Sequence, residues 1–138
     1  RHPDVELVLT GVGIDRFADA PGVTVAGRVP IEELARLYRS ASGLVFPSLY
    51  EGFGMPPIEA MASACPVACS SAGSLPEVCG DAAIYFDPLD PESIASAMDR
   101  ILTTDTSDLV KRGLERASRF TWSRCAERHL SVYSELLA

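Results

Sequence analysis

An apolar run that leads into a turn rich in glycine and proline constrains the fold of this chain most strongly. Residues 43–46, Gly-Leu-Val-Phe, read as a buried strand, and the turn at 51–57 carries two glycines and two prolines. Proline fits the first turn of a helix, where its missing N–H would have no partner, so a helix is expected to begin there. A strand, a glycine loop and a helix N-terminus in this order favour anion binding, and the carboxylates Glu51 and Glu59 flank the loop.

The rest of the chain alternates between strands and helices. Strands are expected at 5–10, 23–26, 43–46, 66–69 and 83–86. Helices are expected at 31–41, 56–63, from Pro91 to about 101, 109–118 and 123–137, with Asp90 and Ser123 as N-caps, and at most one helical turn is expected at 75–79. This alternation predicts an α/β fold, a Rossmann-like parallel sheet with flanking helices, whose ligands bind beyond the carboxyl ends of the strands.

Composition limits the possible functions. The chain has 138 residues, one domain's worth, and no apolar run approaches the ~20 residues of a membrane span. A net charge of −7 argues against a nucleic-acid surface, so any phosphate site must be built locally from backbone N–H groups and a few arginines. The four cysteines match no zinc pattern, which favours buried thiols in a reducing cytoplasm.

The stretch from Glu51 to Glu59 resembles the signature of the retaining glycosyltransferases of family 4, which have the GT-B fold. In that pattern a Glu precedes Gly-Phe-Gly, here residues 52–54, and a second Glu follows on a helix. Further segments occur in the family's order: Gly27-Arg28-Val29, Leu37–Ala41, Pro66-Val67, Leu75–Val78 and Gly80–Ala83. The likeness covers nearly the whole chain and weakens after about Asp105.

The resemblance implies roles for individual residues. Glu51 would contact hydroxyls of the donor sugar as the catalytic carboxylate, and Glu59 would bind the ribose diol. A carboxylate can accept hydrogen bonds from two neighbouring hydroxyls, and the dipole at the start of the helix would keep Glu59 ionised. The remaining donor-binding residues are the loop Gly52, Phe53, Gly54 and Met55, through backbone N–H groups, and the base-binding turn Gly27, Arg28 and Val29. Phe53 is expected to pack, and the loop at 70–75 to lie beside the site.

The implied reaction is transfer of a sugar from a nucleoside diphosphate sugar to an acceptor hydroxyl, with no cofactor and no metal. Polysaccharide biosynthesis in the cytoplasm is the expected setting, with the inner face of the membrane as an option for the full-length protein. Two alternatives remain open: a nucleotide-sugar epimerase on the same fold, and a non-catalytic nucleotide-binding or interaction domain.

Relatives begin this domain with one more strand, followed by a Gly-Arg turn that holds the diphosphate. The chain 1–138 is therefore expected to be a single nucleotide-sugar-binding domain, the C-terminal half of a GT-B fold, with the helix near 123–137 docking on an absent N-terminal domain. Alone, it should be inactive. The missing central strand should lead to direct pairing of the first and third strands, or to a strand-exchanged oligomer.

One departure from the family pattern concerns Ala64. Relatives usually have glycine at this position, two residues before the proline that opens the fourth strand, Pro66. If the preceding helix ends with a left-handed residue there, alanine costs about 1 kcal/mol relative to glycine.

Overall fold

The computed structural model describes residues 2–137, which divide into two compact units that meet between Arg36 and Leu37. The first unit contains β1 (Leu7–Thr10), a short 3-10 helix (Asp15–Phe17) and β2 (Val23–Gly27). Helix α1 (Ile31–Ser40) crosses the boundary. β1 and β2 run parallel, with Leu7 opposite Val23, and a register shift follows Leu9. The carboxyl ends of the two strands lie together, because the Gly11 N–H donates to the Gly27 carbonyl over 2.9 Å.

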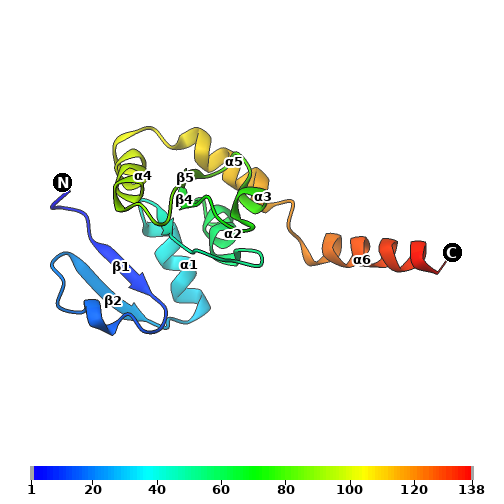
Figure 1. The fold of residues 1–138 in the computed structure, drawn as a ribbon, viewed down its shortest axis with the longest axis horizontal. Helices are drawn as coiled ribbons and strands as arrows, with labels where there is room; N and C mark the ends of the chain where they lie inside the picture. The colour runs from blue at the N-terminus through cyan, green and yellow to red at the C-terminus, as the bar shows by residue number, and fades with distance from the viewer. Residues whose placement is uncertain (1, 138) are drawn as a thin grey trace. The chain divides into compact units, whose positions relative to one another are not determined.

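The second unit is a three-stranded parallel sheet with helices around it (Figure 1). Its elements are β3 (Leu44–Phe46), α2 (Met55–Ala62), β4 (Val67–Ser70), α3 (Leu75–Cys79), β5 (Ile84–Phe86), α4 (Pro91–Thr103), α5 (Ser107–Ala117) and α6 (Trp122–Leu136). The strand order is β3-β4-β5, with Leu44 opposite Val67 and Ala68 opposite Ile84. All four residues of the central strand are buried, as expected for a parallel strand that is covered on both faces.

The core of the second unit lies between this sheet and helices α4 and α5. It consists of Ala68, Ile84, Phe86, Ala97, Ile101 and Leu109. On another side of the unit, α2 packs closely on α5, where a Cβ built at Gly113 would lie 3.2 Å from Met61 Cγ. The small residue at this position lets the two helix backbones approach each other.

The structure confirms the predicted α/β class, and all five strands and six helices occur close to their predicted positions. One of the two outcomes expected for the missing strand is wrong. The first and third strands do not pair directly, because within residues 2–137 β1 pairs with β2 and the other three strands form a separate sheet. The strand-exchanged oligomer, the other expected outcome, stays a prediction. An apolar strand pattern identifies a strand but not its partner, and here β1 pairs with the strand that follows it in the chain.

The two predicted helix caps have different outcomes. Asp90 caps α4 as predicted, because its carboxylate accepts a 3.0 Å hydrogen bond from the Glu92 N–H. Ser123 does not cap α6. The hydroxyl of Thr121 accepts the Arg124 N–H over 3.2 Å instead, because the backbone is still extended at Thr121 and Ser123 already lies inside the helix.

The condition considered for Ala64 holds, because a left-handed residue ends the helix α2. Ala64 has a φ of 59° and is the one residue other than glycine with a positive φ between residues 2 and 137. The Cys65 N–H donates to the Ala60 carbonyl over 2.9 Å, and the Ala64 N–H donates to the Met61 carbonyl over 3.1 Å. This hydrogen-bond pattern is the Schellman motif, which glycine normally closes.

Candidate functional site

The loop between β3 and α2 depends on a glycine at the start of the helix. Gly54, the N-cap of α2, has φ 96° and ψ 62°, a left-handed conformation that L-residues with a Cβ rarely adopt. A Cβ at this position would also lie 2.5 Å from Leu75 Cδ2. Both the conformation and the close packing therefore require glycine. Met55 then opens α2, and the two prolines follow in its first turn, as the sequence predicted.

Two serines hold the loop around Glu51. The Ser48 hydroxyl lies 2.9 Å from Glu51 Oε1, so it can donate to the carboxylate. The Ser74 hydroxyl lies 2.9 Å from the Glu51 carbonyl and 3.0 Å from the Phe53 carbonyl. Gly73, just before it, approaches the Glu51 backbone so closely that a Cβ would lie 3.3 Å from the Glu51 nitrogen. The predicted position of the 70–75 loop beside the Glu51 loop is thereby confirmed.

Phe53 packs against another aromatic ring, as predicted. Its centroid is 5.3 Å from that of Phe120, and the rings meet edge to face at 84°. The guanidinium of Arg116 lies over the other ring of this pair, 5.3 Å from the Phe120 centroid. The side chain of Phe53 therefore ties the glycine loop to the segment after α5, and its neighbours Gly52 and Gly54 leave the loop backbone free of bulky side chains.

Glu59 is partly buried on α2, and its carboxylate lies near the side chain of Tyr38 on α1. Burial, followed by the nearby Glu59 charge, raises the pKa of Tyr38 to about 12, so the Tyr38 phenol is neutral. The dipole argument for Glu59 is wrong. Glu59 is the fifth residue of α2, whose first turn has no acid, and the helix dipole acts mainly on the first turn.

The predicted base-binding turn lies in the first unit. Gly27 ends β2 with a φ of 64°, a conformation that suits glycine, and Arg28 is exposed. Glu51, Gly52, Phe53, Gly54, Met55 and Glu59 thus all lie in the second unit, on the loop before α2 and on α2, whereas Gly27, Arg28 and Val29 lie in the first.

The individual contacts of two residues near the loop were not predicted. Tyr38 was named only within the segment Leu37–Ala41 that matches the family's order, although a buried tyrosine hydroxyl needs a hydrogen-bond partner, and that requirement is a usable signal. Ser74 lies in the 70–75 loop that was expected beside the site, but its hydrogen bonds to the Glu51 loop span more than twenty residues, and no local pattern indicates them. A pocket of about 650 Å³ also adjoins the loop, lined by Gly52 and Phe53 and by arginines from α5 and α6.

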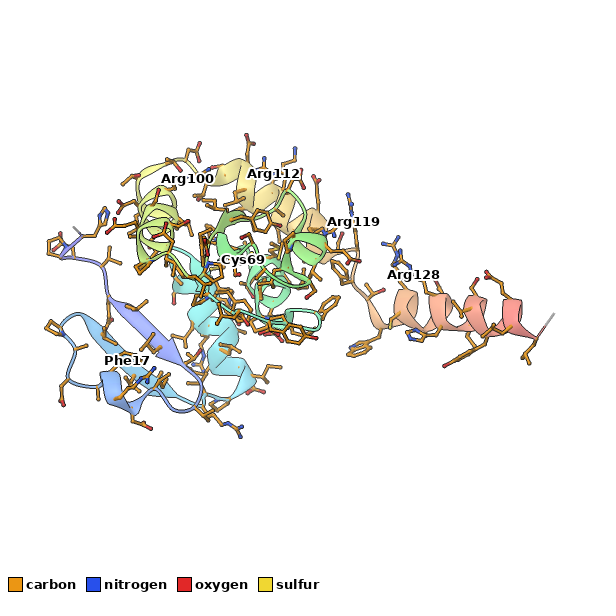
Figure 2. The ribbon with its side chains drawn as sticks, in the orientation of Figure 1. Phe17, Cys69, Arg100, Arg112, Arg119 and Arg128 are labelled. Carbon is orange, nitrogen blue, oxygen red and sulfur yellow. The ribbon has the colours of Figure 1, made fainter. Side chains whose placement is uncertain are left out.

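The cysteines are free thiols, and Cys65, Cys69 and Cys79 are buried. The sulfur atoms of Cys69, which Figure 2 labels in the interior, and Cys79 are 4.0 Å apart. Their hydrogen bond, together with burial, raises the pKa of Cys69, so this thiol stays protonated. In the part of the chain that the structure describes, no group of three or more His, Cys, Asp or Glu side chains could hold a metal ion. Likewise, no helix there is long and apolar enough to cross a membrane.

Comparison with protein families gives one match, to the family model described as "Glycosyl transferases group 1", over residues 1–104. The O-antigen chain mannosyltransferase B of Escherichia coli is 42% identical over 125 residues, which cover 89% of this chain and 33% of that protein. The MMP alpha-(1->4)-mannosyltransferase of Mycolicibacterium hassiacum is 39% identical over 113 residues, which cover 78% of this chain and 28% of that protein. The chain therefore spans about a third of the length of these curated relatives.

Solved structures show the same fold. A sucrose-phosphate synthase from Thermosynechococcus elongatus superposes with a TM-score of 0.76 at 32% identity, covering 90% of this chain and 32% of the other. A glycosyltransferase from Rickettsia africae superposes with a TM-score of 0.77, covering 97% of this chain and 40% of the other, and its 19% identity supports the fold alone.

Proposed function

This chain belongs to the group 1 glycosyltransferases, and we propose that it is the donor-binding part of a retaining glycosyltransferase of the GT-B type. Its ligand would be a nucleoside diphosphate sugar, and the reaction would move the sugar to an acceptor hydroxyl. The relatives named above include two mannosyltransferases, so the transferred sugar is proposed to be a hexose.

The observation that carries the proposal is the pair of carboxylates at the glycine loop. Glu51 receives a hydrogen bond from Ser48, and its backbone carbonyl accepts one from Ser74. Glu59 is only partly buried, and a carboxylate has about four acceptor sites, so it can accept hydrogen bonds from a diol. Polar groups that are held in place before the ligand arrives bind hydroxyls at a lower entropic cost.

In this proposal each part of the loop acts on a different part of the donor. Glu59 accepts hydrogen bonds from the two ribose hydroxyls, and Glu51 contacts hydroxyls of the sugar. The backbone N–H groups of Phe53, Gly54 and Met55 stabilise the negative charge that grows on the leaving diphosphate, without a metal ion. A left-handed Gly54 helps, because the backbone can approach the ligand there without a side chain in between.

The remaining contacts are proposed for segments beyond this loop. Gly27, Arg28 and Val29 would contact the base. The helix α6, whose described residues are all exposed, would dock on a preceding domain of a longer enzyme, since the chain spans about a third of its relatives. The free thiols suit the reducing cytoplasm as the place of action. On its own, the 138-residue chain would bind nucleotide sugar weakly and transfer nothing.

A donor panel tests the proposal. The enzyme that contains this chain should release nucleoside diphosphate from at least one hexose donor when an acceptor is supplied. Glu51→Ala should reduce transfer by at least about 100-fold, the loss typical of a group that acts in the transition state, while nucleoside diphosphate affinity stays within about twofold. Glu92→Ala, which removes an exposed acid on α4, is the matched control and should leave both unchanged.

The other outcomes are equally informative. Interconversion of two donor sugars without transfer would indicate an epimerase, although the relatives named here are transferases. Nucleotide binding without turnover of any donor would indicate a non-catalytic domain. Equal losses of transfer and affinity in Glu51→Ala would show that Glu51 holds the loop and does not contact the sugar.

A further inference from the structure

The pocket beside the Glu51 loop carries a concentration of positive charge that the donor site does not use. Four arginines line it, Arg116 and Arg119 from α5 or its end and Arg124 and Arg128 from α6, against one carboxylate, Glu77. The chain as a whole has a net charge of −7 and only 12 basic residues. A third of all its lysines and arginines therefore face one cavity of about 650 Å³, a volume typical of small-molecule sites.

The sequence spacing explains how these side chains meet. Arg112, Arg116 and Arg119 are four and three residues apart, so they follow one face of α5 and its C-terminal end, and Arg124 and Arg128 are one turn apart on α6. In Figure 2 Arg119 extends from the end of α5 and Arg128 from α6. The first turn of α6 also faces this region, and its positive helix end adds to the field of the arginines.

Two of the arginines on the α5 face already have structural partners. Arg112 Nε donates to the Asp81 carbonyl over 2.9 Å. Arg116 donates to the carbonyls of Val78, over 2.7 Å, and Glu77, which are the last carbonyls of the short helix α3. These two residues join α5 to α3, and their role is explained by the fold.

The other three arginines have no such role. Among residues 2–137, no ion pair or side-chain hydrogen bond is recorded for Arg119, Arg124 or Arg128. All three are exposed at the wall of the pocket. Three guanidinium groups on the wall of one hollow raise the local positive potential, which favours an anionic ligand there.

We propose that the cavity between α3, the end of α5 and the start of α6 is a binding site for a phosphate-bearing ligand, held by Arg119, Arg124 and Arg128. A guanidinium group can donate two parallel hydrogen bonds to two oxygens of one phosphate, and these charged hydrogen bonds are stronger than neutral ones. The edge-to-face pair of Phe53 and Phe120 also lines the cavity and would contact an apolar part of the ligand next to its phosphate. The ligand would be a phosphate ester or diphosphate, either soluble or the headgroup of a lipid.

The site is separate from the proposed donor carboxylates but coupled to them. Phe53 belongs both to the glycine loop and to the floor of the pocket, and Ser74 lines the pocket while it holds the carbonyls of Glu51 and Phe53. A ligand in the arginine pocket would therefore restrict the loop that carries Glu51. The claim of phosphate binding does not depend on the proposed transfer reaction.

The single tryptophan of the chain provides a local readout. Trp122 lies between Phe120 and Arg124 in the sequence and is 85% exposed, so its fluorescence reports on the connection between α5 and α6. Pyrophosphate is the probe, titrated into the chain at constant ionic strength with chloride as the balancing anion. We expect a saturable change in Trp122 fluorescence that chloride does not cause.

The variant test uses a charge-matched pair. Replacement of Arg119, Arg124 and Arg128 by Gln together should weaken pyrophosphate binding by at least about tenfold. The control replaces Arg36, Arg39 and Arg100, three exposed arginines outside the pocket, by Gln and should change binding less than twofold. Arg128→Gln alone, an exposed change within α6, provides a milder variant with an expected loss of about threefold.

Two results would overturn the proposal: no saturable response to pyrophosphate, or equal losses in the pocket and control triples. Two further arms identify the source of the phosphate. Competition by vesicles that contain phosphatidate, and not by neutral vesicles, would indicate a lipid headgroup. Competition by glycerol phosphate without an effect of either vesicle would indicate a soluble phosphate ester.

Discussion

Strands β1 and β4 each consist of three apolar residues followed by a hydroxyl residue, but their surroundings differ. β1 reads Leu-Val-Leu-Thr and none of its four residues is buried, whereas β4 reads Val-Ala-Cys-Ser and all four are buried. The difference follows from the number of neighbours. β4 has a strand on each side and helices around it, while β1 has a single partner, β2. An apolar strand sequence therefore does not determine burial, which depends on the layers that cover the strand.

This contrast indicates where the stability of the chain resides. A two-stranded sheet is only marginally stable in water, and a sheet of three strands packed on helices can be stable by itself. Among the described residues, every buried side chain lies at Tyr38 or later in the chain. The buried apolar core therefore belongs to the second unit. We therefore expect the first unit to open locally and the second to set the global free energy of unfolding.

The sharpest test of this contrast replaces one valine by alanine in each strand, which removes two methyl groups in both cases. Val67 on β4 is fully buried, and Val8 on β1 is 38% exposed. Val67→Ala should lower the free energy of unfolding by about 2–3 kcal/mol, because the surrounding core cannot fill the cavity. Val8→Ala should cost less than about 1 kcal/mol. Urea denaturation followed by circular dichroism measures both, and equal losses would remove the distinction between the two units.

A second pair of variants compares two glycines with positive φ. Gly54→Ala in the site loop should cost at least about 2 kcal/mol, because the new Cβ meets Leu75 as well as a left-handed backbone. Gly22 in the first unit has a φ of 74°, and nothing lies within 4 Å of a Cβ built there. Gly22→Ala should therefore cost only the free energy of placing alanine in a left-handed conformation, about 1 kcal/mol. The same urea experiment reports both. If Gly22→Ala proved the costlier change, packing at Gly54 would not be the reason for its glycine.

How far the sequence predicted these features depends on the range of the interactions. Local patterns located the five strands, the six α-helices and the cap at Asp90, because each is set by a few neighbouring residues, but not the short 3-10 helix Asp15–Phe17. The sequence motif also picked out the glycine loop with Glu51 and Glu59. The N-cap of α6 was misassigned by two residues, since Thr121 and Ser123 are chemically similar candidates on the same segment.

The long-range features could not be predicted in this way. The division of the strands into two sheets depends on which edges meet, and no strand pattern encodes that. Ser74 reaches the Glu51 loop from more than twenty residues away, and Tyr38 reaches Glu59 from the preceding helix. The arginine pocket needs the bend between α5 and α6, which brings together side chains that look like two ordinary charged helix faces in the sequence.

A substitution at Ala64, in the second unit, should raise the free energy of unfolding, whereas the valine and glycine substitutions above lower it by larger or similar amounts. Its φ of 59° is unfavourable for alanine, so Ala64→Gly should raise the free energy of unfolding by about 1 kcal/mol. Ala62→Gly, which places a glycine inside α2 two residues earlier, is the matched control and should lower it by a similar amount. A decrease for Ala64→Gly would mean that the unfolded chain gains more from glycine than the folded turn does.

The pH dependence of stability tests the contact between Tyr38 and Glu59. Burial and the Glu59 charge raise the pKa of Tyr38 from 10.0 to about 12, so the folded state favours the neutral phenol. This contribution is fully present below pH 10 and is lost as the pH rises from 10 to about 12. Tyr38→Phe should flatten the fall in stability over this window, measured by urea denaturation at a series of pH values. An unchanged slope would show that Tyr38 titrates alike in both states.

The proposal that the second unit binds the donor is tested most directly by Glu59 itself. Isothermal titration of nucleoside diphosphate into the enzyme that contains this chain should show Glu59→Gln binding about 10–100-fold more weakly than wild type, the value of a charge-assisted hydrogen bond to a diol. Glu92→Gln, an exposed acid on α4, should bind as wild type does. Wild-type affinity in Glu59→Gln, with the protein folded, would contradict the assignment of the carboxylate pair as the donor site.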